Sequence, residues 1–146
     1  MQIEYALLAD HAEVLNGKLY LMGGGWDVRQ APAAPARAQF AVAIGVRVEW
    51  DETNVPIALQ LRLEDDDGAA VFQLAGQLNV GRPPHVPAGS SQLIQAAVAL
   101  NAELPAYGGY RAAVRASMPG GREDARALPF RLVPAPPGAA PAAPAG

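Results

Sequence analysis

The chain has 146 residues and a mass of 15.2 kDa, which fits one folding domain, and 51% of its residues are hydrophobic. Alanine accounts for 31 of these hydrophobic residues, so 43 larger apolar side chains remain for a core. This composition excludes collagen-like, coiled-coil and disulfide-stapled proteins, and no apolar run approaches the roughly 18 residues that span a bilayer. The sequence therefore predicts a soluble globular domain that has no membrane partner.

The charge balance and the lack of cysteine narrow the classes of function further. Eleven Lys and Arg residues against 14 Asp and Glu residues give a net charge of -3. Binding to the nucleic-acid backbone requires a basic patch, so we expect no nucleic-acid partner. Without cysteine, disulfides and thiolate chemistry are excluded. The segment 1–5 carries an acid where a signal peptide would carry basic residues, so the predicted location is the cytoplasm.

The N-terminal third predicts two or three strands. Apolar residues alternate with others from Ile3 to Ala9, which is typical of a strand with one buried face. Asn16-Gly17 stands between two apolar runs and is a strong hairpin signal. The segment 23–36, with three consecutive glycines and a Pro-Ala stretch, is predicted to be an irregular connector.

Period-two alternation is clearest in the middle of the chain. It runs over 40–50 and resumes over 55–63, and we expect these two strands to pair antiparallel. Asp67-Gly68 then predicts a tight hairpin, because this dipeptide readily adopts positive φ. The returning strand, 72–80, contains Gly76, which we interpret as a bulge or a place of close backbone approach.

The C-terminal half predicts three more strands. The three prolines of 81–89 exclude a central strand and predict a loop that crosses the domain. Alternation over 94–104 favours a strand, although its alanines also suit a helix. Strands near 110–118 and 128–132 predict a closing hairpin. The fold class is therefore a single antiparallel β-sandwich of about eight or nine strands over residues 1–133, immunoglobulin-like or jelly-roll in connectivity. A disordered Pro/Ala/Gly tail, 134–146, is predicted to follow.

Residues with catalytic or metal-binding chemistry are few. The histidines, His11 and His85, have no second histidine at metal-ligand spacing, so we predict no metal site. The acidic run Asp65–Asp67 lacks the alternating pattern of a calcium loop, and a solvated hairpin tip is the simpler interpretation. Gly23–Gly25 is not followed by the Lys-Ser/Thr of a phosphate loop, and no Gly-x-Ser-x-Gly motif occurs. We therefore predict no cofactor and disfavour an enzyme.

Several segments carry distinctive combinations of residues. They are Ala6–Asp10, Asn16–Asp27, Trp50–Asn54, the hairpin acids before Gly68, Val80–Pro84 and Leu128–Arg131. With these segments the chain resembles an uncharacterised family of small bacterial proteins of unknown function. The resemblance covers residues 2–133 and implies one all-β domain, and it supplies no activity, cofactor or substrate.

Two functional hypotheses follow from these observations. The first is a non-catalytic module that binds a protein or assembles with itself, because alanines form flat faces opposite the large apolar residues, although simple filler also explains them. The alternative is a small-ligand or carbohydrate-binding domain that uses loops at one end of the sandwich. It requires the loops to meet around a pocket with an exposed indole. Its candidate ligand-binding residues are Trp26, Asp27, Trp50, Asp51, Asn54, Arg82 and His85.

Overall fold

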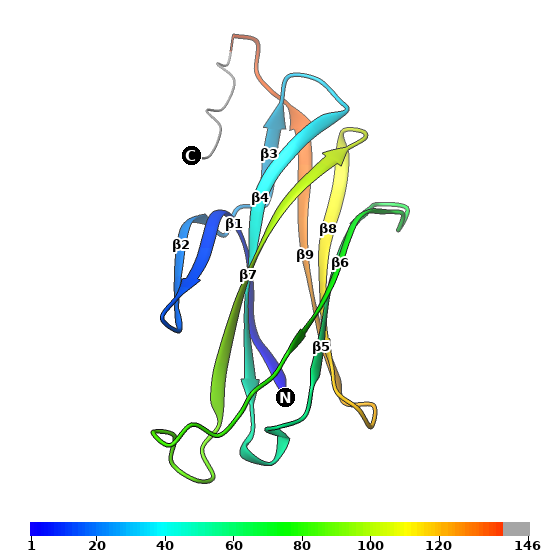
Figure 1. The fold of residues 1–146 in the computed structure, drawn as a ribbon. Helices are drawn as coiled ribbons and strands as arrows, with labels where there is room; N and C mark the ends of the chain where they lie inside the picture. The colour runs from blue at the N-terminus through cyan, green and yellow to red at the C-terminus, as the bar shows by residue number, and fades with distance from the viewer. Residues whose placement is uncertain (139–146) are drawn as a thin grey trace.

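A computed structural model describes residues 1–138, which form nine strands and one short 3-10 helix (Figure 1). The predicted all-β sandwich is confirmed. No helix within this part of the chain has the length and apolar character needed to cross a membrane. The elements are β1 (Gln2–Leu15), β2 (Lys18–Gly24), β3 (Val28–Ala31), β4 (Ala36–Val48), η1 (Trp50–Glu52), β5 (Ile57–Asp65), β6 (Ala70–Leu78), β7 (Gln92–Leu104), β8 (Gly108–Ser117) and β9 (Glu123–Pro134).

The strands form two packed sheets. One has four strands in the order β2-β1-β4-β7, and the other has five in the order β3-β9-β8-β5-β6. The alternating apolar residues of β4, β5, β8 and β9 point between the sheets, and the core side chains Phe40, Ile44, Leu63, Val114 and Phe130 are at most 3% exposed. The local pattern of one buried face per strand therefore produces the shared core.

Several local predictions are confirmed. Asn16 and Gly17 have φ of 51° and 72° at the turn between β1 and β2, and Gly68, with φ of 82°, lies in the connection between β5 and β6. The segment 81–89 is a loop, 92–104 is a strand, and β8 and β9 pair antiparallel. These features are local in sequence, so turn residues and alternation are enough to predict them.

The predicted pairing of the strands at 40–50 and 55–63 is wrong. β4 belongs to the four-stranded sheet and β5 to the five-stranded sheet. The chain changes sheets at η1, where the N–H of Glu49 donates to the Glu52 carboxylate (2.9 Å) and the Thr53 hydroxyl donates to the C=O of Trp50 (2.8 Å). Both strands bury their apolar faces in the same core, so the same alternation fits strands in opposite sheets.

Two further predictions are corrected by the strand register. The connector at 23–36 contains β3, a four-residue strand that pairs parallel with the end of β9 and is too short to show alternation. Gly76 pairs with Leu59 in regular register, and the irregularity lies between Leu63 and Glu64 instead. A Cβ on Gly76 would meet no atom within 4 Å, so the predicted bulge or close approach at Gly76 is wrong.

The β1–β2 hairpin covers the alanine-rich outer face of the four-stranded sheet. Only the first part of β1, up to Ala9, pairs with β4, and the remainder pairs with β2. The amide of Gln95 on β7 donates to the C=O of Gly17 (2.8 Å), which fixes the hairpin turn over that face. Ala41 and Ala43 are 3% and 0% exposed beneath it. Their small side chains permit this third layer, so the chain itself occupies this face.

The last strand ends one residue beyond the predicted domain boundary at residue 133. β9 ends at Pro134, and the N–H of Ala135 donates to the C=O of Ala31 (2.9 Å). Within the predicted tail, 134–146, residues 139–146 lie outside the described part of the chain.

Candidate functional site

Two of the predicted loops meet at one end of the sandwich. The guanidinium carbon of Arg82 lies 4.5 Å from the centre of the Trp50 ring, which is half-buried. Arg82 also donates to the Thr53 hydroxyl (2.6 Å) and to the C=O of Trp50 (2.9 Å). The N–H of Asn54, a residue with φ of 61°, donates to the C=O of Val80 (2.7 Å). The structure thus brings Trp50, Asn54 and Arg82 together.

Arg82 acts as a clamp between the crossing loop and η1. The planar guanidinium of Arg82 donates two hydrogen bonds and also lies over the indole of Trp50. Lysine has no planar group and cannot make this combination of contacts. Asp51 and His85 are exposed nearby in sequence, on η1 and in the crossing loop respectively. The contacts of Arg82 therefore hold two loops in place.

Removing this clamp should loosen the end of the sandwich. We expect Arg82→Ala to lower the free energy of unfolding by about 1–2 kcal/mol, because one cation–π contact and two hydrogen bonds are lost at a partly exposed site. The variant should also be cut faster by protease within 81–89. Urea unfolding and limited proteolysis measure the two effects, and Arg131→Ala, on exposed β9, is the control. Equal stability and equal cleavage of the two variants would contradict the clamp.

The third predicted loop lies elsewhere. Trp26 is half-buried and packs edge-to-face on Phe40 and Phe130, with ring centres 5.5 and 5.6 Å away. Its Nε1 is buried and has no hydrogen-bond partner in the described structure. Phe40 lies near the start of β4, and Trp50 follows the end of β4. The eight residues of strand between Phe40 and the end of β4 span about 26 Å. Trp26 and its neighbour Asp27 therefore do not join the Trp50 and Arg82 loops.

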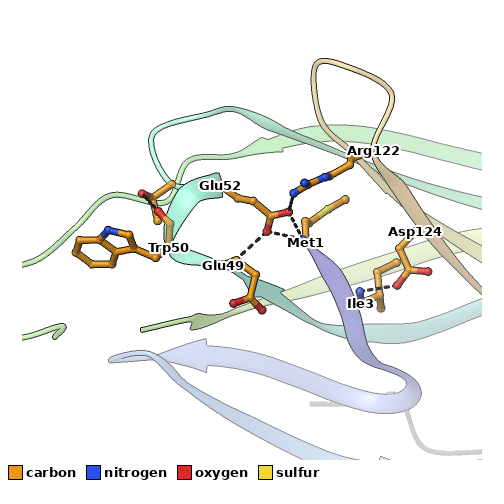
Figure 2. A network of polar contacts seen from close by, with 8 residues as sticks. Met1, Ile3, Glu49, Trp50, Glu52, Arg122 and Asp124 are labelled. Carbon is orange, nitrogen blue, oxygen red and sulfur yellow. Dashed lines mark hydrogen bonds and ion pairs between the residues drawn. The ribbon is translucent and has the colours of Figure 1, made fainter. Parts of the chain in front are cut away.

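A buried carboxylate organises the end of the sandwich that contains η1 (Figure 2). Glu52 is 3% exposed and accepts hydrogen bonds from the Met1 ammonium, the Arg122 guanidinium and the N–H of Glu49. These donors come from the start of β1, from the β8–β9 turn and from the end of β4. One side chain thus ties three parts of the chain together, and its charge is matched by two cations.

Side chains also connect the first strand with the last. The backbone N–H of Ile3 donates to the Asp124 carboxylate (2.8 Å), as Figure 2 shows, and Arg126 donates to the C=O of Ile3 (2.8 Å). Asp124 and Arg126 also form an ion pair (2.9 Å). These bonds satisfy backbone groups of Ile3 that a neighbouring strand would otherwise pair, so one side of the sandwich is closed between β1 and β9.

The pKa values of both carboxyls lie below their ordinary values. Burial raises the pKa of Glu52, but hydrogen bonds from the N-terminal ammonium, Glu49 and Arg122 lower it by more. Burial likewise raises the pKa of Asp124, and bonds from the backbone N–H groups of Ile3 and Ala125, with the charge of Arg126, outweigh it. The folded protein therefore favours the ionised form of both groups.

This preference predicts a loss of stability in acid. Above the ordinary Glu pKa of 4.5 the contribution of Glu52 is fully present, and it is lost as the pH falls through the lower pKa of the folded state. Asp124 contributes with the same sign, starting from its ordinary value of 3.8. We expect the urea midpoint to fall steadily below about pH 4.5, and Glu52→Gln to flatten this fall. A Glu52→Gln profile parallel to that of the unsubstituted chain would contradict this assignment.

The Glu52 cluster was not among the predicted site residues. The three-residue spacing of Glu49 and Glu52, which suits a capping box at a short helix, is the one local signal for it. The partner Arg122 comes from the distant β8–β9 turn, and nothing in its local sequence indicates this contact.

The opposite side of the sandwich is open. On this side β6 and β7 are the last strands of their sheets, as β3 and β2 are at the other ends, and within residues 1–138 no further strand pairs with the outer edge of β6 or β7. Leu74 of β6 is 47% exposed, whereas its cross-strand partner Leu61 is 2% exposed. Ile94 and Val98 of β7 are half-buried against the core. Leu74, Ile94 and Val98 are therefore only partly covered along this side, whereas Leu100, Ala102 and Leu104 of β7 are buried.

A surface hollow of about 340 Å³ lies over β5, β6 and the β8–β9 turn, and it contains none of the predicted site residues. Its lining is Pro56, Ala58, Gly76, Gln77, Ser117, Met118 and Pro119. In residues 1–138, no three His, Asp or Glu side chains are grouped so that they could hold a metal ion. This hollow therefore offers no cluster of acid-base groups.

The fold and its polar clusters define an all-β, two-sheet domain whose buried charges fasten strands to one another. The chain belongs to a family of unknown function, DUF6941, which matches residues 4–126, so the resemblance to an uncharacterised family is confirmed. No curated protein matches the chain. The X-ray structure of Northeast Structural Genomics Consortium target SoR45 is similar at 14% identity, over 92% of this chain and 87% of that chain, with a TM-score of 0.31.

Proposed function

We propose that this chain is a non-catalytic module that binds a protein partner or assembles with itself. The observation that carries the proposal is the open side of the sandwich, with the free edges of β6 and β7. Free edges carry unpaired backbone groups that can pair with another strand, and proteins usually protect them with charges, prolines or bulges. β7 has 13 residues, no proline and Glu103 as its single charged residue. The nine residues of β6 carry neither charge nor proline.

The contacts of the charged residues support a binding role over a catalytic one. Glu52, Asp124 and Arg82 are engaged with other parts of the chain. The surface pairs Arg47–Glu4 and Arg115–Glu123 likewise connect neighbouring strands. We place the module in the cytoplasm, where a chain without cysteine needs no disulfides.

The alternative function, binding of a small ligand or carbohydrate, has weaker support. It needs the three loops around one pocket, and Trp26 packs on Phe40, far along β4 from Trp50. Where the Trp50 and Arg82 loops meet, Arg82 stacks on the Trp50 ring and donates to Thr53. Part of the binding capacity of Arg82 is therefore already used within the chain. The geometry therefore favours the strand edges as the binding surface.

Light scattering after size-exclusion chromatography, together with pull-down by the immobilised full chain, tests the proposal. Ala75→Lys and Ala99→Lys each place a charge on one free-edge strand at an exposed position, and Ala125→Lys places the same charge on the outer face of β9. We expect self-association or a captured protein that one edge variant loses and Ala125→Lys retains. A monomer at all concentrations that captures no protein in an edge-dependent way would contradict the proposal.

A further inference from the structure

We infer that β7 pairs antiparallel with β7 of a second copy of this chain, about a two-fold axis at Val98, an inference that rests on the proposed function. Val98 is the middle residue of β7, so this register uses the full length of the strand. In the four-stranded sheet β7 has β4 as its one partner, and the pairing continues the sheet across the axis into the second copy.

The register matches side chains of the same kind. In an antiparallel pair, residues directly opposite each other lie on the same face of the sheet. On the core-facing row Ala96 then meets Leu100 and Ile94 meets Ala102, so apolar residues meet apolar residues. On the outer row Ala97 meets Ala99, so small residues meet small ones, and Gln95 meets Asn101, whose amides already bond to Gly17 and Arg37 within each chain. The edge is thus complementary to itself.

The charge on β7 is compatible with the same register. Glu103 lies five residues from Val98, so the two Glu103 residues stand at opposite ends of the paired region, with their Cα atoms about 33 Å apart. Each Glu103 faces Leu93 of the other copy. Repulsion between these like charges over that distance is largely screened at physiological salt. A register centred near Glu103 would bring the two carboxylates together and pair few residues.

The free edge of β6, on the same side of the sandwich, fits a second copy less well. β6 has nine residues against 13 in β7, and Gly76 interrupts its core-facing row between Leu74 and Leu78. A glycine contributes no side chain to cross-strand contacts and weakens a strand. β7 has no glycine, and its partly covered Ile94 and Val98 lie on the row that the pairing would extend. These differences favour β7 over β6 as the edge that pairs.

Single cysteines can test the register because the chain contains none. In the proposed pair the two Ala99 Cα atoms lie about 8 Å apart, and those of Glu103 about 33 Å apart. We therefore expect Ala99→Cys to give a covalent dimer with a short bismaleimide, and spin-labelled Glu103→Cys to give a long distance by double electron–electron resonance. Ala125→Cys, exposed on β9, is the matched control and should stay uncrosslinked.

Charge substitutions distinguish the edge of β7 from the edge of β6. Ala99→Lys should convert the dimer into a monomer in light scattering, with an unchanged circular dichroism spectrum, and Ala75→Lys on β6 should leave the dimer intact. If Ala75→Lys abolishes the dimer, or if Ala125→Cys crosslinks it, the β7 pairing is wrong. The proposal that the chain assembles with itself would then still hold. A strict monomer would also overturn the pairing; in that case edge-dependent capture of another protein decides whether the proposed function survives.

Discussion

Replacing Glu52 with alanine is expected to lower the free energy of unfolding by about 3 kcal/mol, because breaking a buried ion pair by removing one partner leaves an uncompensated charge. Glu52 is 3% exposed, and its contact with the Met1 ammonium is partly buried. Arg122 is the less affected partner, since its side chain is 64% exposed and can return to water. We therefore expect the loss to come mainly from the partly buried Met1 ammonium, and urea unfolding at pH 7 measures it.

The control for Glu52 is an ion pair on the surface. Glu123 binds Arg115 across the β8–β9 hairpin with both side chains about half exposed, so Glu123→Ala should cost less than about 1 kcal/mol. Glu52→Gln keeps the shape of the side chain and removes its charge, and we expect it to fall between the two alanine variants. Equal losses for Glu52→Ala and Glu123→Ala would show that the buried cluster does not hold the strands together.

Replacing Phe130 with alanine is expected to cost about 3–5 kcal/mol, the usual range for removing a buried aromatic side chain. Phe130 is 2% exposed and lies at the centre of an aromatic cluster. It stacks on Tyr110, at 5.6 Å between ring centres, and meets Phe40 and Trp26 edge-to-face. Its loss leaves a cavity between the two sheets and removes aromatic contacts along with the apolar burial.

A leucine on the open side of the sandwich provides the comparison for Phe130. Leu74 also lies on a core-facing row but is 47% exposed, so Leu74→Ala should cost about 1 kcal/mol or less. Urea midpoints, measured with unchanged slopes, give the two values. A Phe130→Ala cost no larger than that of Leu74→Ala would mean that the cluster relaxes to fill the cavity.

The strands could be predicted from the sequence because alternation is a local property. The run over 40–50 requires one buried face and therefore predicts β4 without any knowledge of its neighbours. It does not specify the neighbouring strand, and for this reason the pairing of 40–50 with 55–63 was predicted wrongly. Glu49 and Glu52 stabilise the connection through η1, which carries the chain from one sheet to the other. A tight turn would instead have kept the two strands in one sheet.

The candidate site could be predicted only in part, for a similar reason. Trp50 and Arg82 belong to the two loops at the same end of their strands, and the structure brings them together. Trp26 follows β2, and its position on Phe40 depends on how the β1–β2 hairpin folds over the sheet, which no local pattern indicates. The Glu52 cluster depends on contacts across most of the chain, such as the 70 residues that separate Glu52 from Arg122.

The links between the beginning and the end of the chain also determine the order in which it can fold. Ile3 and Asp124 are 121 residues apart, and the parallel ladder of β3 joins residues 28–31 to the end of β9. The hairpin at Asn16-Gly17 can form by itself within microseconds, as isolated hairpins do. Contacts of such long range slow folding, so we expect the complete sandwich to form in about milliseconds to seconds. We therefore expect the β1–β2 hairpin to form before the contacts that join β1 and β3 to β9.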